Sequence, residues 1–487
     1  MQDPNTSHLD LQATAKEIIQ RYGFEPDFSA PVAAQLANLD RQPKSSPSRD
    51  IRDMRNLLWS SIDNDTSRDL DQIEVVERVS NGDIKIMVGI ADVDAFVAKL
   101  TPIDQHAARE TTTVYTGIRN FPMLPEQLST GVTSLLENQD RLGIVIEFVV
   151  DAAGNLKSSD LYRALVRNKA QLQYNSVGAW LEAAAAPPVK VAASTELQDQ
   201  LKLQSEVAQK LKSQRFENGA LNLQTDEVHP LVLNDKVVDV VKQQKNHATE
   251  LIEDFMVAAN GVVARLLENV SSLRRIVRTP KRWDRILQLA ATKGETLPVQ
   301  PDSKALNDFL LRRKAADPDH FADLSLAVIK LIGPGEYVLE RAGDTAPGHF
   351  GLAVQDYTHS TAPNRRFADI VTQRLIKAML AGQTNPYSDN ELTAIAANCT
   401  QKEDAARKVE REMSKRLAAV AMQLRIGEVF DAIVTGATDH GTFVRVLQPH
   451  VEGLLAQGAQ GLDVGDRLKA RLIRADVSKG YIDFARA

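Results

Sequence analysis

The sequence has almost no cysteine and no long hydrophobic run. Its one cysteine, Cys399, cannot form a disulfide within the chain; we expect an inert buried thiol and a reducing compartment. No stretch approaches the ~20 apolar residues that span a bilayer, and the first residues lack the basic and apolar regions of a signal peptide. We therefore expect a cytoplasmic protein that has no membrane partner.

The chain also lacks an excess of positive charge, because its formal net charge is -6 over 487 residues. Any nucleic acid must therefore be bound by a local basic lining rather than by the charge of the whole molecule. Hydrophobic and charged fractions of 43% and 25% are ordinary for a globular protein, and the length suffices for two to four domains.

The most informative segment is Asp63-Asn64-Asp65-Thr66-Ser67-Arg68-Asp69-Leu70-Asp71, which contains four carboxylates. If residues 69–71 are extended, side-chain alternation places Asp69 and Asp71 on one face. Asp63 can fold back towards them, because the intervening residue types favour a turn. Such oxygen ligands select Mg²⁺ or Mn²⁺ over Zn²⁺. Taken alone, however, the cluster is more readily explained as a solvated acidic turn.

The periodicity of apolar residues predicts the organisation of the rest of the chain. Two helices are expected over 9–22 and 29–39, as a packing hairpin or a helix-turn-helix-like unit, followed by a polar linker. Strand-like runs dominate from residue 50 to about 170, among them 84–97 and 142–150. Helical patterns follow from about 175 to 425, and the last of them is a long basic helix over 402–425. Alternating residues and glycine-rich turns after residue 426 predict a small OB-type barrel.

An ordered series of short motifs runs through the middle of the chain. Its members are Arg49-Asp50-Ile51-Arg52, the acidic segment, Ile90-Ala91-Asp92-Val93, Val114-Tyr115, Phe121-Pro122-Met123-Leu124-Pro125, His349-Phe350-Gly351-Leu352, Tyr357-Thr358-His359, Arg365-Arg366-Phe367 and Asp369. Each motif alone is weak, but their order resembles the ribonuclease II family of exoribonucleases, whose catalytic unit is the RNB domain. The terminal barrel resembles an S1-type RNA-binding domain.

The resemblance implies an α+β fold with three parts. Residues 1–48 would form the short N-terminal helical region, and residues 49–425 the RNB catalytic domain, with mixed sheets surrounded by helices. Residues 426–487 would form the S1-type OB-fold β-barrel. Related proteins commonly carry N-terminal barrels that narrow the channel mouth. The two short helices here lead us to expect a more open mouth that admits structured RNA with a 3′ overhang.

The resemblance also assigns roles to the acidic segment. Asp63, Asp69 and Asp71 match the family's metal-binding aspartates, and loss of Asp71 is expected to stop catalysis. Gln72 stands where the family has another aspartate, so this ligand is neutral and metal affinity should fall. Asp65 or Glu74 could compensate for the missing charge. We expect Mg²⁺ as the cofactor, with Mn²⁺ as an alternative.

Further residues match positions that bind RNA in the family. Arg365 matches the arginine that grips the scissile phosphate, a task that suits a planar and permanently charged fork. Arg366 is either a structural residue or a second phosphate contact. Tyr115 would stack on the terminal base, and Trp283 is either the opposing ring or a packing residue. Glu410 would lie near the terminal nucleotide. In the barrel, the candidates are Phe443 and Lys469.

The resemblance therefore implies a processive 3′→5′ exoribonuclease. It would hydrolyse single-stranded RNA to nucleoside 5′-monophosphates during RNA turnover or processing. Gln72 leaves open an RNA-binding regulator with a weakened metal site. A factor that docks on the ribosome through its terminal barrel is the third alternative.

Overall fold

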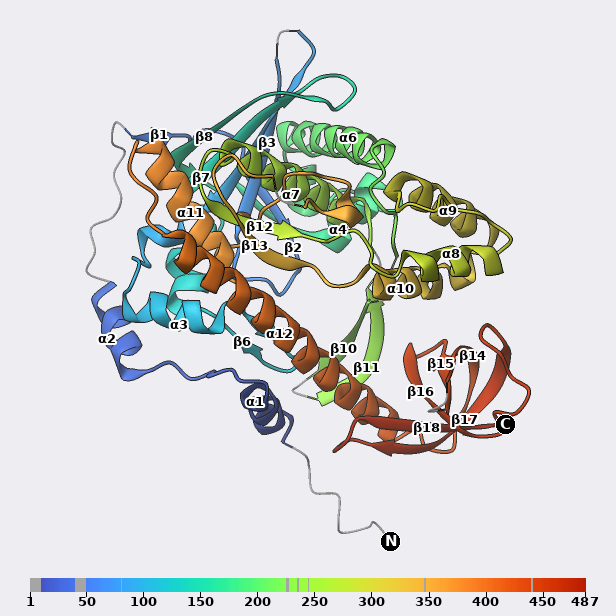
Figure 1. Cartoon of the computed structure of the whole chain (residues 1–487). Coiled ribbons are helices and arrows are strands. Elements are labelled where there is room, and N and C mark those ends of the chain that lie inside the picture. The colour runs from blue at the N-terminus through green and yellow to red at the C-terminus, as the bar shows by residue number, and fades with distance from the viewer. Residues whose placement is uncertain are drawn as a thin grey trace.

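The computed structural model describes residues 10–39, 50–79, 81–224, 227–233, 236–243, 245–345, 347–438 and 441–487. The predicted linker over 41–48 lies outside these ranges. The described residues form mixed sheets surrounded by helices, together with a closed five-stranded barrel, which confirms the predicted α+β fold class (Figure 1).

A seven-stranded mixed sheet organises the larger part of the molecule, with strand order β1-β8-β7-β4-β3-β2-β9. Its strands are β1 (Ile51–Asp53), β2 (Ser60–Asp63), β3 (Gln72–Arg78), β4 (Ile84–Ala91), β7 (Asp140–Val150), β8 (Leu156–Arg167) and β9 (Ala170–Gln173). The central strand β4 is buried along nearly its whole length. Apolar side chains therefore point to both faces of the sheet at its centre, and both faces must be covered.

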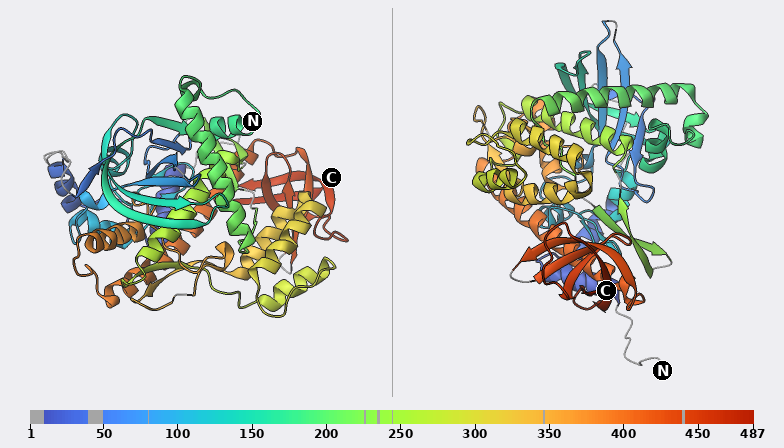
Figure 2. Two further views of the ribbon diagram at one scale, coloured as in Figure 1. Left: turned by 90° about the horizontal axis from the view of Figure 1, so that it is seen from above. Right: turned by 90° about the vertical axis from the view of Figure 1, so that its right-hand side faces the viewer.

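The chain after residue 175 is mainly helical, as its pattern predicts, and three short strand pairs lie outside the seven-stranded sheet (Figure 2). The helices are α3 (Pro102–Glu110), α4 (Tyr174–Leu181), α5 (Val189–Ala192), α6 (Thr195–Glu217), α7 (His247–Leu266), α8 (Trp283–Thr292), α9 (Ser303–Ala316), α10 (Phe321–Ile332) and α11 (Phe367–Leu380). The strand pairs are β5 (Val114–Tyr115) with β6 (Asn120–Phe121), β10 (Glu227–Leu233) with β11 (Lys236–Gln243), and β12 (Ser272–Ile276) with β13 (Glu336–Glu340).

One long helix, α12 (Asp389–Gln423), joins the parts of the molecule. It begins at a capping box in which Ser388 and Glu391 exchange hydrogen bonds, and its 35 residues span roughly 50 Å. Buried side chains of its first turns join the core around the sheet, those of its middle pack with α1 (Leu11–Arg21), and those of its last turns join the barrel core. The helix predicted from residue 402 therefore begins earlier, at Asp389, and packs in three hydrophobic cores.

The two predicted N-terminal helices are present, as α1 and as α2 (Ala30–Leu39). The first packs on α12, where Ile18 and Ile19 are buried against its middle turns. The second packs on α3. Each helix is thus anchored to a different helix of the larger part of the molecule.

The terminal strands close into the predicted barrel, in the order β14-β15-β16-β18-β17. The strands are β14 (Val429–Thr438), β15 (Gly441–Val446), β16 (Val451–Gln457), β17 (Arg467–Asp476) and β18 (Tyr481–Arg486). The strand β16 is not anticipated from the sequence; it pairs parallel to β18 and so closes the barrel. No helix in the described ranges combines the length and apolarity that a bilayer-spanning segment needs.

Candidate active site

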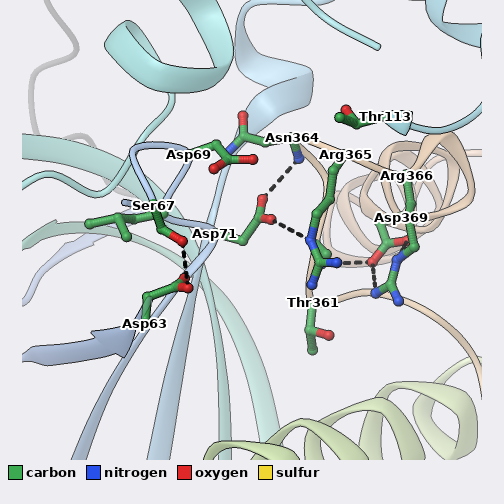
Figure 3. Close-up of polar contacts among 12 residues, drawn as sticks. Asp63, Ser67, Asp69, Asp71, Thr113, Thr361, Asn364, Arg365, Arg366 and Asp369 are labelled. Atoms are coloured by element: carbon green, nitrogen blue, oxygen red, sulfur yellow. Dashed lines mark hydrogen bonds and ion pairs between the residues drawn. The ribbon is translucent and has the colours of Figure 1, made fainter. Parts of the chain in front are cut away.

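Asp71 lies at the centre of the candidate site, immediately before β3. Its side chain is only 2% exposed, and one carboxylate oxygen, Oδ1, accepts the backbone N–H of Asn364 at 2.9 Å. The other oxygen, Oδ2, lies 3.4 Å from Nε of Arg365 (Figure 3). Burial raises the pKa of Asp71 to about 7, although the positive charge of Arg365 opposes this shift. The site therefore joins a buried acid to a cation from a segment nearly 300 residues later in the chain.

Asp69 lies near Asp71, and Asp63 lies near Asp69. Asp63 ends β2, and its carboxylate accepts the Ser67 hydroxyl at 2.8 Å across the turn (Figure 3). Burial raises the pKa of Asp69, and repulsion from Asp63 raises it further. Asp69 in turn raises the pKa of Asp71. Asp69 is thus close enough to repel both Asp63 and Asp71.

Ser134 fixes the irregular segment that carries these aspartates. Its hydroxyl donates to the carbonyl of Arg68 at 2.6 Å and accepts the N–H of Leu70 at 3.0 Å. The next N–H, that of Leu135, donates to the carbonyl of Leu70. A segment without regular secondary structure acquires defined backbone partners in this way. Ser134 is a positioning residue to which the sequence alone assigns no role.

Tyr115 links the acidic segment to α12. Its ring is 38% exposed, its hydroxyl donates to Oδ2 of Asp69 at 3.4 Å, and its backbone N–H donates to Oε1 of Glu410 at 3.3 Å. Tyr115, Glu410, Arg365 and Arg366 line one pocket of about 270 Å³. The structure therefore brings these four predicted residues together beside the aspartates.

The two consecutive arginines have different surroundings. Arg366 forms an ion pair with Asp369 at 2.7 Å, and the Asp369 side chain is fully buried. The Arg365 side chain is 48% exposed at the pocket and lies against Asp71. Arg366 therefore has a structural partner, whereas the guanidinium of Arg365 is accessible to a bound molecule.

The acidic segment offers the hard oxygen ligands that Mg²⁺ prefers, and the mutual repulsion of its carboxylates would be relieved by a cation. In the structure, the positive charge beside Asp71 comes from Arg365. Among the described residues, no three histidine, cysteine, aspartate or glutamate side chains gather closely enough to hold one metal ion. The donor chemistry therefore fits a divalent cation, although Asp63, Asp69 and Asp71 do not converge on a single point.

Gln72 is the first residue of β3 and is buried. Two residues further on, Glu74 is completely buried as well, and neither of its carboxylate oxygens has a hydrogen-bond partner. Burial raises the pKa of Glu74 well above its ordinary value, and Asp63 raises it further. The sequence offers Glu74, like Asp65, as a residue that could compensate for Gln72, and the fold adds that the Glu74 side chain is completely buried.

Three predicted RNA contacts lie elsewhere. Trp283 is 5% exposed, and its indole N–H donates to the carbonyl of Pro298 at 2.9 Å within the core formed by α8, α9 and α10. The structure therefore places it in the packing role and does not bring it into the pocket of Tyr115. In the barrel, Lys469 pairs with Asp431 on the neighbouring strand, and Phe443 lines a groove of about 870 Å³ against α10 and α12.

Comparison with protein-family models assigns most of this chain. The RNB domain matches residues 51–382, and the RNase II-type exonuclease C-terminal S1 domain matches residues 428–487. The chain belongs to the RNB family, which confirms the resemblance seen in its motifs.

Several relatives carry the name ribonuclease R. The protein of Thermotoga maritima is 30% identical over 468 residues, which cover 89% of this chain and 64% of that protein. The Escherichia coli protein is 28% identical, over 93% of this chain and 59% of its own length. The chain thus spans about three fifths of these two relatives.

Solved structures share the fold. The apo form of Mycoplasma genitalium RNase R has a TM-score of 0.86 at 23% identity. The match covers 98% of this chain and 78% of the Mycoplasma genitalium chain. That enzyme is also known in complexes with ribose-methylated single-stranded RNA and with double-stranded RNA. Yeast Ssd1, described as a pseudonuclease, has a TM-score of 0.65 at 16% identity, with coverages of 98% and 58%.

Proposed function

We propose that this protein is a metal-dependent 3′→5′ exoribonuclease that degrades single-stranded RNA processively to nucleoside 5′-monophosphates. The observation that carries the proposal is the 3.4 Å approach of Arg365 to the buried carboxylate of Asp71. The guanidinium that would bind the phosphate thus lies directly beside the acidic segment that would hold the divalent ion. Membership of the RNB family and the RNase II-type S1 domain support the same activity.

Asp63, Asp69 and Asp71 would hold the divalent cation, Mg²⁺ or Mn²⁺. When bound, such ions stabilise the charge that develops on the attacking and leaving oxygens of a phosphodiester. Arg365 would bind the scissile phosphate through its planar fork, because it is accessible and permanently charged. Burial of Asp71 reduces the water around these charges, which strengthens their interactions.

The pocket beside this pair suits the last nucleotide of an RNA. The half-exposed ring of Tyr115 offers a stacking surface, which is tolerant of sequence because every base has a π-face. Glu410 lines the same pocket and accepts a hydrogen bond from the backbone N–H of Tyr115. The Glu410 carboxylate would accept a hydrogen bond from a hydroxyl of the terminal ribose.

The barrel would contact the RNA further upstream, through Phe443 and Lys469. Complexes of the Mycoplasma genitalium enzyme with ribose-methylated single-stranded RNA and with double-stranded RNA support both kinds of RNA as binding partners. Our proposal extends to duplexes that carry a 3′ overhang. These contacts would hold the strand between successive cleavages, which is the basis of processivity.

A 5′-labelled RNA incubated with the protein and Mg²⁺ tests this proposal. We expect the labelled strand to shorten progressively from its 3′ end with release of mononucleotides, and a chelator to stop the reaction. A DNA strand of the same sequence is the control, because it lacks the 2′-hydroxyl that a ribonuclease can recognise. RNA that stays intact in Mg²⁺, or shortens equally in the chelator, would contradict the proposal.

A second candidate function is an RNA-binding regulator with a weakened metal site. It is favoured by the neutral Gln72 in a position that the family resemblance assigns to an aspartate, and by the dispersed arrangement of the three aspartates. The same experiment separates the two functions, because the regulator would retain the RNA tightly without shortening it.

A further inference from the structure

Glu74 is an acid without a partner inside the sheet. Its exposed fraction is 0%, and both carboxylate oxygens lack a hydrogen bond to any described residue. An ionised carboxylate in such a place is strongly disfavoured, and even a neutral one forfeits the hydrogen bonds it makes in water. A buried polar group of this kind in a native fold requires an explanation.

The surroundings of Glu74 are rich in oxygen. Ser60, its partner residue on β2, has a buried hydroxyl without a hydrogen-bond partner, and so does the side-chain carbonyl oxygen of Gln204 on α6. The Gln204 amide donates to the backbone carbonyl of Glu74 at 3.5 Å, which places its side chain at this point of the strand. Unpartnered oxygens from three elements thus occur around one position, and oxygens are the ligands of hard cations.

This position lies next to the acidic segment. Side chains alternate along a strand, so Gln72 and Glu74 share one face of β3. Asp63 is three residues beyond Ser60 at the end of β2, and its carboxylate acts electrostatically on Glu74. The negative charge that is missing at Gln72 therefore reappears two residues later, on the same face and within the influence of Asp63.

We propose that Glu74 supplies the divalent-cation site of Asp63 with the negative charge that Gln72 lacks. The proposal rests on the nuclease function, because the cation is the one that this function requires. Glu74 is thus a metal-site residue of this chain that compensates for a neutral neighbour. Position 74 is the next position after 72 on the same face of β3. A carboxylate at position 74 therefore lies on the same side of the sheet as Gln72.

Direct measurement of Mn²⁺ binding to the full chain without RNA tests the role of Glu74. The substitution Glu74→Gln preserves shape, and its amide can donate to the oxygens of Ser60 and Gln204, so thermal stability without metal should be kept or increased. Mn²⁺ affinity, followed by calorimetry or by electron paramagnetic resonance, should fall at least about tenfold. The matched control is Glu77→Gln on the same strand, where the side chain is half-exposed and paired with Lys85.

Charge relocation provides the decisive variant. In the double variant Gln72→Asp/Glu74→Gln, Mn²⁺ affinity should return to within about threefold of the natural protein. The single variant Gln72→Asp should bind Mn²⁺ more tightly than the natural protein and remains informative if Glu74→Gln fails to fold. Unchanged affinity in Glu74→Gln, or a double variant as weak as Glu74→Gln, would overturn the proposal.

These outcomes are distinguishable from a failure of the nuclease function. If the natural protein binds Mn²⁺ through Glu74 but leaves RNA intact, the metal-site proposal stands and the nuclease proposal fails. If the natural protein degrades RNA with Mg²⁺ while Glu74→Gln has unchanged Mn²⁺ affinity, the nuclease proposal stands and the role of Glu74 is wrong.

Discussion

The hydroxyl of Tyr115 donates to the carboxylate of Asp69 at 3.4 Å, so the exposed ring and the acidic segment are tied together. Removing the ring by Tyr115→Ala should weaken the binding of a short oligonucleotide by about 1–3 kcal/mol, or roughly 5- to 150-fold. The variant Tyr115→Phe keeps the ring and should bind within about threefold of the natural protein. Fluorescence anisotropy with a five-nucleotide RNA measures both; equal losses in the two variants would refute the stacking role.

The variant Asp71→Asn isolates the charge of the central aspartate. The asparagine oxygen can still accept the N–H of Asn364, so the fold and RNA binding should persist. Turnover of a labelled RNA should fall at least about 100-fold, because the negative charge beside Arg365 is lost. Asp151→Asn, in the exposed turn between β7 and β8, is the control. Parallel loss of binding and turnover would contradict a role in the chemical step.

The neighbouring arginines should give opposite results. Arg365→Ala should reduce turnover by about 100-fold or more with little change in thermal stability, because its side chain is half exposed. Arg366→Ala leaves the fully buried Asp369 without its ion-pair partner and should cost about 3–5 kcal/mol of stability. Thermal unfolding and single-turnover cleavage of both variants check this contrast. A stable but inactive Arg366→Ala would instead assign it a phosphate contact.

The stability of the protein should fall between about pH 4 and pH 7, in part because of Asp254 on α7. Burial raises the pKa of Asp254 to about 7, although its ion-pair partner Arg215 opposes the shift. In this window the folded chain keeps a proton that the unfolded chain has released, so rising pH favours unfolding. The effect amounts to roughly 4 kcal/mol at most, since one pKa unit corresponds to about 1.4 kcal/mol.

Asp254→Asn should flatten this dependence of stability on pH. The change of the thermal unfolding midpoint with pH is measured at roughly pH 4.5, 5.5, 6.5 and 7.5, which span this window. Glu217→Gln, an exposed substitution at the end of α6, is the control and should leave the slope unchanged. An equally steep slope in Asp254→Asn would show that other groups carry the dependence.

The sequence predicts much of the fold because its signals are local. Alternating apolar residues identify β4, β7 and most of the barrel, and helical periodicity identifies α1 and the second half of α12. Strand β16 escapes prediction because its glycine and polar residues blur the alternation. Its place is fixed by pairing with β18, which is distant in the chain.

The candidate site is only partly predictable, because its decisive contacts join distant segments. Asp71 and Arg365 are recognisable from their motifs. The sequence alone does not show that Arg366 forms an ion pair with Asp369, whereas the side chain of Arg365 stays accessible. Trp283 illustrates the opposite difficulty. An isolated aromatic residue has the same local pattern whether it stacks on a base or packs in a core, and here it packs.

Cleavage of unlabelled RNA in ¹⁸O-enriched water with Mg²⁺ is the most direct test of hydrolysis at the Asp71–Arg365 pair. We expect nucleoside 5′-monophosphates that carry one ¹⁸O on the phosphate, released by the natural protein and not by Asp71→Asn. Mass spectrometry that finds cyclic phosphates, phosphates without ¹⁸O, or equal release by Asp71→Asn would contradict it.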